Sequence, residues 1–109
     1  MYYPSSAVTQ EVMSAPKAPP GRFTLLYFAA ASSFTRRQHD FLVAPLPLAQ
    51  LYDELEKSYA GIKEQVLSSC ALTLNLDYVD PEEEASKGEK GAVIQPGDEV
   101  AIIPPVSAG

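Results

Sequence analysis

The segment from Pro47 to Gly61 constrains the fold more than any other part of the chain. Apolar residues recur there at three- and four-residue intervals, which is the spacing of one face of an α-helix, and polar residues fill the outer positions. Proline suits the first turn of a helix, and glycine often ends one in a left-handed conformation. The pattern predicts one amphipathic helix with an apolar face formed by Leu48, Leu51, Tyr52, Leu55 and Tyr59.

Segments of strand character lie on both sides of this helix. Residues 22–28 and 40–44 precede it, and residues 70–76 and 99–103 follow it, all rich in apolar and β-favouring side chains. Shorter extended pieces are expected at 78–79 and 92–94, and the order Pro96-Gly97 fits the centre of a type II turn. Because an apolar helix face must be covered, we expect an α+β fold with a mixed sheet of about four to five strands packed on one main helix.

A chain of 109 residues suits a single domain with a compact core. Residues 1–21 carry four prolines among small and polar residues, and we expect them to be a disordered extension. The domain is predicted over 22–103, with an exposed, mobile acidic loop at 80–91 and an extended tail at 104–109. Phe34 fits either the core or a partner surface, and the other expected core residues are Phe23, Leu25, Leu48, Leu51, Leu55 and Val100.

Charge and cysteine content argue against several classes of function. The formal net charge of -6 opposes binding to nucleic-acid phosphates, which draws on clusters of Lys and Arg, and it suits a basic protein partner. The single cysteine, Cys70, has no partner for an internal disulfide. No apolar run approaches the roughly 20 residues that span a bilayer, and the first residues lack a signal-peptide pattern. The cytosol is therefore the expected compartment, with no membrane association.

Three sets of side chains are candidates for chemistry, and each has a simpler structural interpretation. Cys70 among apolar neighbours is typical of a small core residue, and a nucleophile–base pair with His39 is the alternative. A surface position is the simpler interpretation of His39. A solvated loop is favoured over a metal site for carboxylates that lack the spacing of a calcium loop: Asp80, Glu82, Glu83 and Glu84. We assign no catalytic role and no metal site to these residues.

The end of the chain carries a recognisable order of motifs. It reads Gln95-Pro96-Gly97-Asp98-Glu99-Val100-Ala101-Ile102-Ile103-Pro104-Pro105-Val106-Ser107-Ala108-Gly109, which is a turn, a strand, a proline pair and a terminal glycine. This order resembles the ubiquitin-like β-grasp sulfur carriers, and within them the molybdopterin synthase branch. Residues 25–29 and 75–79 resemble the family's first and third strands more weakly, so the likeness covers about residues 22–109. Two departures are Ala108, where the family usually has glycine, and the long connection at 80–91.

The resemblance implies a function that depends on the terminal glycine. In this family a ubiquitin-activating-like adenylyltransferase and sulfurtransferase consumes ATP to adenylate the C-terminal carboxyl, here Gly109, which then becomes a thiocarboxylate. Its sulfur is donated to cyclic pyranopterin monophosphate, and two such donations build the molybdopterin dithiolene. The resemblance further implies a large catalytic partner subunit, a heterotetramer of two small and two large subunits, no bound cofactor or metal, and no catalysis by this chain alone. The partner-binding tail would be Pro104, Pro105, Val106, Ser107 and Ala108.

The residues of the tail suit such a role on physical grounds. Six residues, 104–109, reach on the order of 20 Å when extended, and two prolines restrict the backbone at their base. The alternatives are a sulfur carrier for thiamine synthesis or tRNA thiolation, and a ubiquitin-like interaction module whose tail takes no part in chemistry. The run from Ile103 to Ser107 favours the molybdopterin branch.

Overall fold

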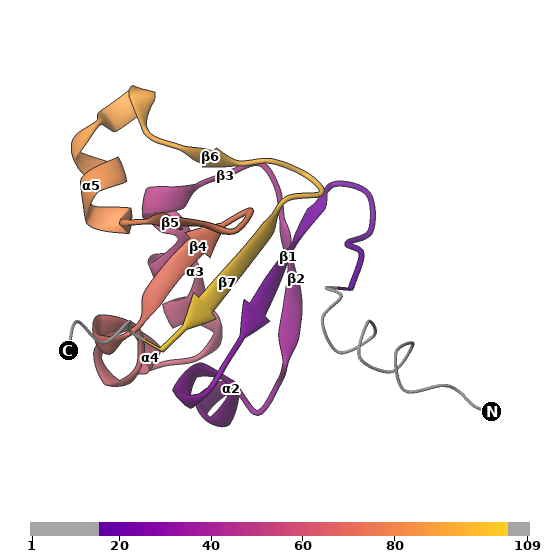
Figure 1. Ribbon diagram of the computed structural model, residues 1–109, viewed down its shortest axis with the longest axis vertical. Coiled ribbons are helices and arrows are strands. Elements are labelled where there is room, and N and C mark those ends of the chain that lie inside the picture. Colours follow the sequence, from indigo (N-terminus) through magenta and orange to yellow (C-terminus); the bar gives the residue numbers. More distant parts are fainter. Residues whose placement is uncertain (1–15, 105–109) are drawn as a thin grey trace.

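The computed structural model describes residues 16–104, and these residues form a five-stranded mixed sheet covered on one face by helices (Figure 1). The strand order is β2-β1-β7-β4-β5. The two central strands, β1 and β7, are parallel, and the other neighbours are antiparallel. The strands are β1 (Arg22–Tyr27), β2 (His39–Val43), β4 (Ala71–Leu74), β5 (Asp77–Val79) and β7 (Glu99–Ile103). The predicted α+β architecture is confirmed.

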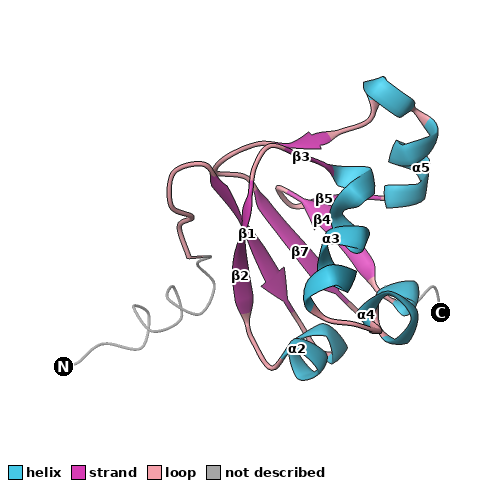
Figure 2. Ribbon diagram, turned by 180° about the vertical axis from the view of Figure 1, so that it is seen from behind, coloured by secondary structure: helices cyan, strands magenta, loops and turns pink. Residues whose placement is uncertain are grey.

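The predicted amphipathic helix lies against the inner face of the sheet (Figure 2). It begins with a 3-10 turn, η1 (Leu48–Gln50), and continues as α3 (Leu51–Ser58). Gly61 has the predicted left-handed conformation, with a φ of 93°. It does not end α3, however, because that helix is already capped at Tyr59, and Gly61 instead precedes the next helix. A second short helix, α4 (Ile62–Gln65), and the 3-10 turn η2 (Leu67–Ser69) then lead the chain to β4.

The core fills the space between the inner sheet face and α3. All six predicted core residues are buried, and Phe34 is half-buried against this core. The strands alternate, so that Phe23, Leu25 and Tyr27 of β1 and Val100 and Ile102 of β7 point inward. Burial of these apolar side chains is the main stabilising contribution to a domain of this size.

The structure corrects the prediction for residues 80–91, where it places a helix and a turn in the expected loop. Helix α5 (Pro81–Ser86) begins with the side chain of Asp80 accepting a hydrogen bond from the Glu82 amide at 2.9 Å, and η3 (Gly88–Lys90) follows. Proline in the first turn and a capping aspartate stabilise such a start. The carboxylate of Glu84 then accepts a hydrogen bond from the Ala92 amide at 2.7 Å, which joins the segment to the chain beyond it.

Helix α2 (Ala30–Thr35), which fills the connection between β1 and β2, was not expected from the sequence. The extended piece expected at 92–94 is present as β6 (Val93–Ile94), and it pairs with β3 (Leu46–Pro47), a short strand that the sequence did not indicate. The turn before β7 is as predicted, since Gly97 has a φ of 88° and the Asp98 amide donates to the Gln95 carbonyl at 3.0 Å.

The amino-terminal segment is described only from Pro16 onward, so residues 1–15 of the predicted extension lie outside the described residues. Residues 16–21 form a loop against the sheet, in which the Thr24 hydroxyl donates to the Pro16 carbonyl at 2.8 Å. Across residues 16–104 we find no helix long and apolar enough to cross a membrane.

Candidate functional site

The base of the predicted tail is held by the centre of the sheet. Strand β7 lies between β1 and β4, with Tyr27 opposite Ile102 on one side and Ala71 opposite Ile103 on the other. The Phe28 amide donates to the Ile102 carbonyl at 3.1 Å and extends the ladder to the end of the strand. Two ladders fix the direction in which the chain leaves the sheet.

Of the predicted tail, the structure describes only the first residue. Pro104 directly follows β7 and is exposed, and it has no amide hydrogen to continue the ladder. The other predicted site residues, Pro105, Val106, Ser107, Ala108 and Gly109, lie outside the described residues. The fold thus places the start of the tail at the end of the central strand.

The outer face of the sheet, opposite the helices, lies beside this tail base. Strand pairing aligns one row across all five strands, and it consists of His39, Leu26, Ala101, Thr73 and Tyr78. Ile103 and Phe28 lie on the same face, toward the end of β7. We call these seven residues the outer sheet face.

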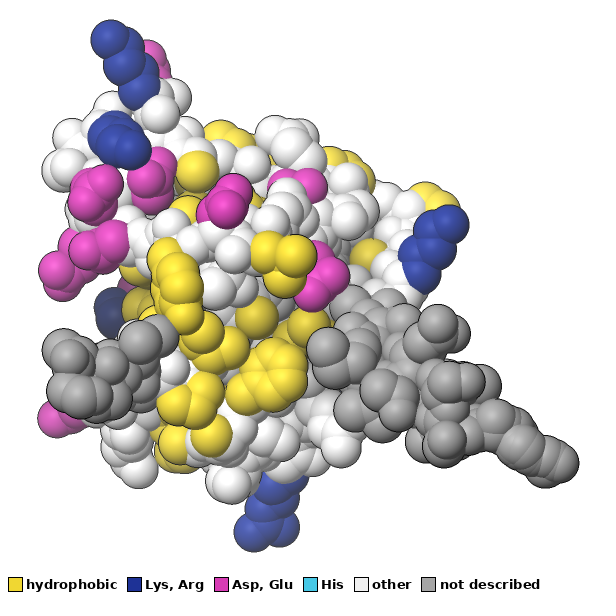
Figure 3. Space-filling view, in the orientation of Figure 1, with side chains coloured by type: hydrophobic (Ala, Val, Ile, Leu, Met, Phe, Trp, Pro, Cys, Tyr) yellow, Lys and Arg dark blue, Asp and Glu magenta, His cyan; other side chains and the backbone are white. Residues whose placement is uncertain are grey.

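Two aromatic side chains of this face are open to solvent, and Figure 3 shows hydrophobic side chains gathered over the sheet. The exposed fraction is 46% for Phe28 and 63% for Tyr78. Contiguous exposed apolar surface on a small domain marks an interaction site, since burying it against a partner is favourable. The outer sheet face and the tail base therefore form one candidate site for a protein partner.

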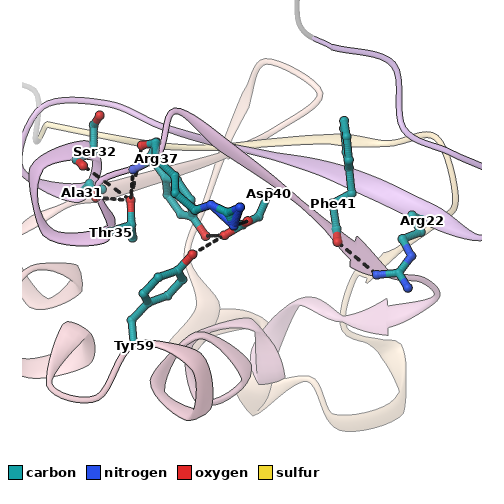
Figure 4. A network of polar contacts seen from close by, with 9 residues as sticks. Arg22, Ala31, Ser32, Thr35, Arg37, Asp40, Phe41 and Tyr59 are labelled. Carbon is teal, nitrogen blue, oxygen red and sulfur yellow. Dashed lines mark hydrogen bonds and ion pairs between the residues drawn. The ribbon is translucent and has the colours of Figure 1, made fainter.

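A polar network braces the sheet behind this site (Figure 4). Oδ2 of Asp40 accepts hydrogen bonds from the hydroxyls of Tyr27 at 2.7 Å and Tyr59 at 2.6 Å, and Oδ1 pairs with Arg37 at 3.0 Å. Burial first, and then the bond to Asp40, raises the pKa of Tyr27, and the same two causes raise that of Tyr59. Both phenols stay protonated donors, and the network ties β1 and β2 to the end of α3.

The structure separates the two residues that were weighed as a nucleophile–base pair. His39 is on the edge strand β2, where its ring packs against Phe41 with centroids 5.0 Å apart. Cys70 directly precedes β4, and β1 and β7 lie between these two strands. Burial raises the pKa of the Cys70 thiol, which disfavours the nucleophilic thiolate. His39 and Cys70 therefore form no catalytic pair.

The described residues also show how the acidic segment is used. Within residues 16–104 no three His, Cys, Asp or Glu side chains are grouped as metal ligands would be. Asp80 caps α5, and Glu84 binds Lys87 at 2.9 Å as well as the Ala92 amide. These two carboxylates serve the local fold.

The chain was compared with known proteins. A family model described as the ThiS family matches residues 25–109. A relative from Phaeosphaeria nodorum, named molybdopterin synthase sulfur carrier subunit, is 54% identical over 89% of this chain and 100% of its own length. The chain belongs to this sulfur carrier family. A member of the family from Emericella nidulans, with the same name, is 56% identical over 80% of this chain and 97% of its own.

Solved structures extend the likeness of this sulfur carrier family member to the fold. A putative molybdopterin converting factor subunit 1 from Pyrococcus furiosus has a TM-score of 0.61 and 20% identity, covering 78% of this chain and 98% of that chain. A chain in a Helicobacter pylori complex of subunits 1 and 2 of molybdopterin-converting factor has a TM-score of 0.52 and 22% identity, covering 81% and 99%. The ubiquitin-like β-grasp fold is thereby confirmed.

Proposed function

We propose that this protein is the sulfur-carrying, non-catalytic small subunit of a molybdopterin synthase and that it carries sulfur on the carboxyl of Gly109. The observation that carries the proposal is membership of the sulfur carrier family together with a match that runs through Gly109. The position of β7 supports it, because a central strand ending at an exposed proline gives a tail a fixed base.

Charging the tail requires activation, since a carboxylate is a poor electrophile. A ubiquitin-activating-like enzyme transfers AMP from ATP to the Gly109 carboxyl and releases pyrophosphate. Sulfide delivered by a sulfur donor then attacks the acyl carbon, AMP leaves, and a thiocarboxylate remains. ATP is consumed by that enzyme, and this chain binds no cofactor of its own. Gly109 has no side chain to obstruct the reacting carbon.

Delivery of the sulfur takes place in the large subunit. The thiocarboxylate sulfur is the nucleophile that this subunit directs at cyclic pyranopterin monophosphate, and a dithiolene needs two charged tails. We propose a heterotetramer of two small and two large subunits in the cytosol. The Helicobacter pylori complex of subunits 1 and 2 supports a large partner, and the free thiol of Cys70 suits a reducing compartment.

The outer sheet face provides the surface on which the large subunit docks. Its exposed Phe28 and Tyr78 offer the aromatic anchors that protein interfaces favour. Ile103 lies on that face at the base of the tail, so a partner bound there also stands where the tail leaves the sheet. Docking and delivery would then use one continuous surface.

The test is to follow the intact mass of the chain during incubation with ATP, an activating enzyme and a sulfur donor. We expect the gain that corresponds to replacing one oxygen by sulfur. A chain lacking Gly109 should fold as the full chain does and show no gain. The control is Ala108→Gly, which restores the usual family ending and should be charged at least as fast. A chain without Gly109 that still supports dithiolene formation would overturn the proposal.

A further inference from the structure

A cleft of about 500 Å³ lies on the helical side of the molecule, away from the outer sheet face. Helices α3 and α5 and the segment from α4 through η2 form its walls, and Cys70 lies in it just before β4. Among the described residues that line it, the apolar part consists of Ala49, Tyr52, Leu67, Cys70, Pro81 and Ala85.

The rim of this cleft is acidic. Asp53 stands on α3, and Asp80 and Glu82 stand at the start of α5. Among the described residues that line the cleft, Lys63 is the only basic one, and its ammonium pairs with Asp53 at 2.6 Å. Asp53 and Lys63 therefore neutralise each other, and Asp80 and Glu82 leave the rim with a net negative charge.

The carboxylates of this rim differ in what they already do. Asp80 is occupied in part by capping α5, and Asp53 is occupied by Lys63. Among residues 16–104, the Glu82 side chain has neither an ion pair nor a hydrogen bond. The Glu82 carboxylate is therefore open to an external cation.

An apolar floor under an acidic rim suits one kind of occupant. Lysine and arginine side chains carry a long aliphatic stem that can lie on apolar surface and a cationic head that can bind carboxylates. Tyr52 adds an aromatic ring, over whose face a cation is attracted. Burial raises the pKa of Tyr52 to about 12, so its hydroxyl remains a neutral donor near Asp80.

One wall of the cleft lies near the base of the tail. Cys70, on its wall, directly precedes Ala71, and Ala71 is the partner of Ile103 at the end of β7. A protein that holds the tail therefore reaches this wall with little further extension.

We propose that the cleft between α3, η2 and α5 is a second docking surface, and that it receives a lysine- or arginine-bearing segment of the large subunit. This inference rests on the proposed function for the identity of the partner. The outer sheet face supplies apolar contact on one side of the tail base, and the cleft supplies charge-selective contact on the other. Paired charges at an interface chiefly set orientation and association rate.

The test compares charge reversals at two adjacent residues of α5. Glu82 lines the cleft, whereas Glu83 is an exposed neighbour outside it, so Glu82→Lys and Glu83→Lys change the net charge equally. We expect Glu82→Lys to weaken binding of the full chain to the purified large subunit about tenfold and to flatten the dependence of Kd on salt. Glu83→Lys should stay within about twofold of the wild type.

Three results would overturn the proposal. Wild-type affinity of Glu82→Lys would remove the cleft from the interface, and equal losses for both variants would show a general charge effect. Slower charging of Glu82→Lys with unchanged binding to the large subunit would assign the cleft to the activating enzyme. Charging of Gly109 is measured on the same samples. Failure of the wild-type chain to gain sulfur would count against the proposed function. Normal charging of the wild type, together with wild-type affinity of Glu82→Lys for the large subunit, would count only against the role of the cleft.

Discussion

Replacing Asp40 with alanine removes the acceptor at the centre of the polar network behind β1. Tyr27 is 2% exposed, so its hydroxyl cannot turn to water, and a buried donor without an acceptor costs about 1–3 kcal/mol. Tyr59 is half-buried and loses a hydrogen bond to a charged group, for about 1 kcal/mol more. The ion pair with Arg37 adds at most about 0.5 kcal/mol, because that side chain is 57% exposed. We expect a total loss of about 2–4 kcal/mol.

Urea denaturation followed by far-ultraviolet circular dichroism measures this loss directly. In a domain of this size each kcal/mol shifts Tm by about 4–8 °C, so a fall of roughly 8–32 °C should accompany Asp40→Ala. Asp40→Asn is the matched control. Both tyrosine hydroxyls bond to Oδ2, and an amide oxygen in that position keeps both as weaker neutral bonds, at a cost of about 1–2 kcal/mol.

Arg37→Ala separates the ion pair from the tyrosine bonds. It should lower the free energy of unfolding by no more than about 0.5 kcal/mol. If Asp40→Ala costs as little as Arg37→Ala, the carboxylate is not the acceptor on which Tyr27 depends, and the reasoning about the network is refuted.

Three further predictions concern the backbone and the tyrosines. A Cβ on Gly91 would lie 2.5 Å from the Glu84 carbonyl oxygen. Gly91→Ala should therefore lower the free energy of unfolding by about 1–3 kcal/mol and speed amide hydrogen exchange in α5. An unchanged exchange rate would contradict this close packing. Leu76 is 84% exposed and has a φ of 75° in the β4–β5 turn. Because glycine adopts this backbone conformation without strain, Leu76→Gly should raise the free energy of unfolding by about 0.5–1 kcal/mol. A lower free energy of unfolding, measured by urea denaturation, would count against backbone strain at this position. The pKa of Tyr27 is higher in the folded than in the unfolded state, so folding favours the neutral phenol. The contribution of Tyr27 to stability is therefore complete at pH values below its unfolded pKa of about 10, and it falls as the pH rises above that value. Tyr27→Phe should flatten this alkaline loss, and an unaltered slope of unfolding free energy against pH would exclude Tyr27 as its source.

The elements with regular patterns were predictable from the sequence. Leu51 and Leu55 mark α3 by helical spacing, and Val100 and Ile102 mark β7 by alternation, because each pattern follows from which side chains the core must bury. The Pro96-Gly97 pair likewise predicted its turn from local backbone chemistry. These signals are short in range, and sequence carries them well.

The remaining elements lacked such a signal. Helix α5 has no buried residue, so no apolar period marks it, and only the Asp80-Pro81 start could have indicated a helix. Helix α2 follows Ala29, whose φ is 51°. Alanine rarely adopts a positive φ, so the sequence does not predict it.

The candidate site shows the same limit. Its motif residues were found from their order near the end of the chain, but the outer sheet face depends on the register of five strands. The network around Asp40 joins residues 13 and 19 positions apart, and the cleft joins three separate helical segments. Such contacts are set by tertiary packing, which no local pattern records.

The central position of β7 has a consequence for the order in which the protein is made. Residues 99–103 are synthesised after the other four strands of the five-stranded sheet, yet they join the β2-β1 pair to the β4-β5 pair. A nascent or truncated chain that ends before them has two separate antiparallel strand pairs and an uncovered core, and such a chain is exposed to aggregation and proteolysis. The chain therefore completes its fold only after β7, which leads into the tail, has been made.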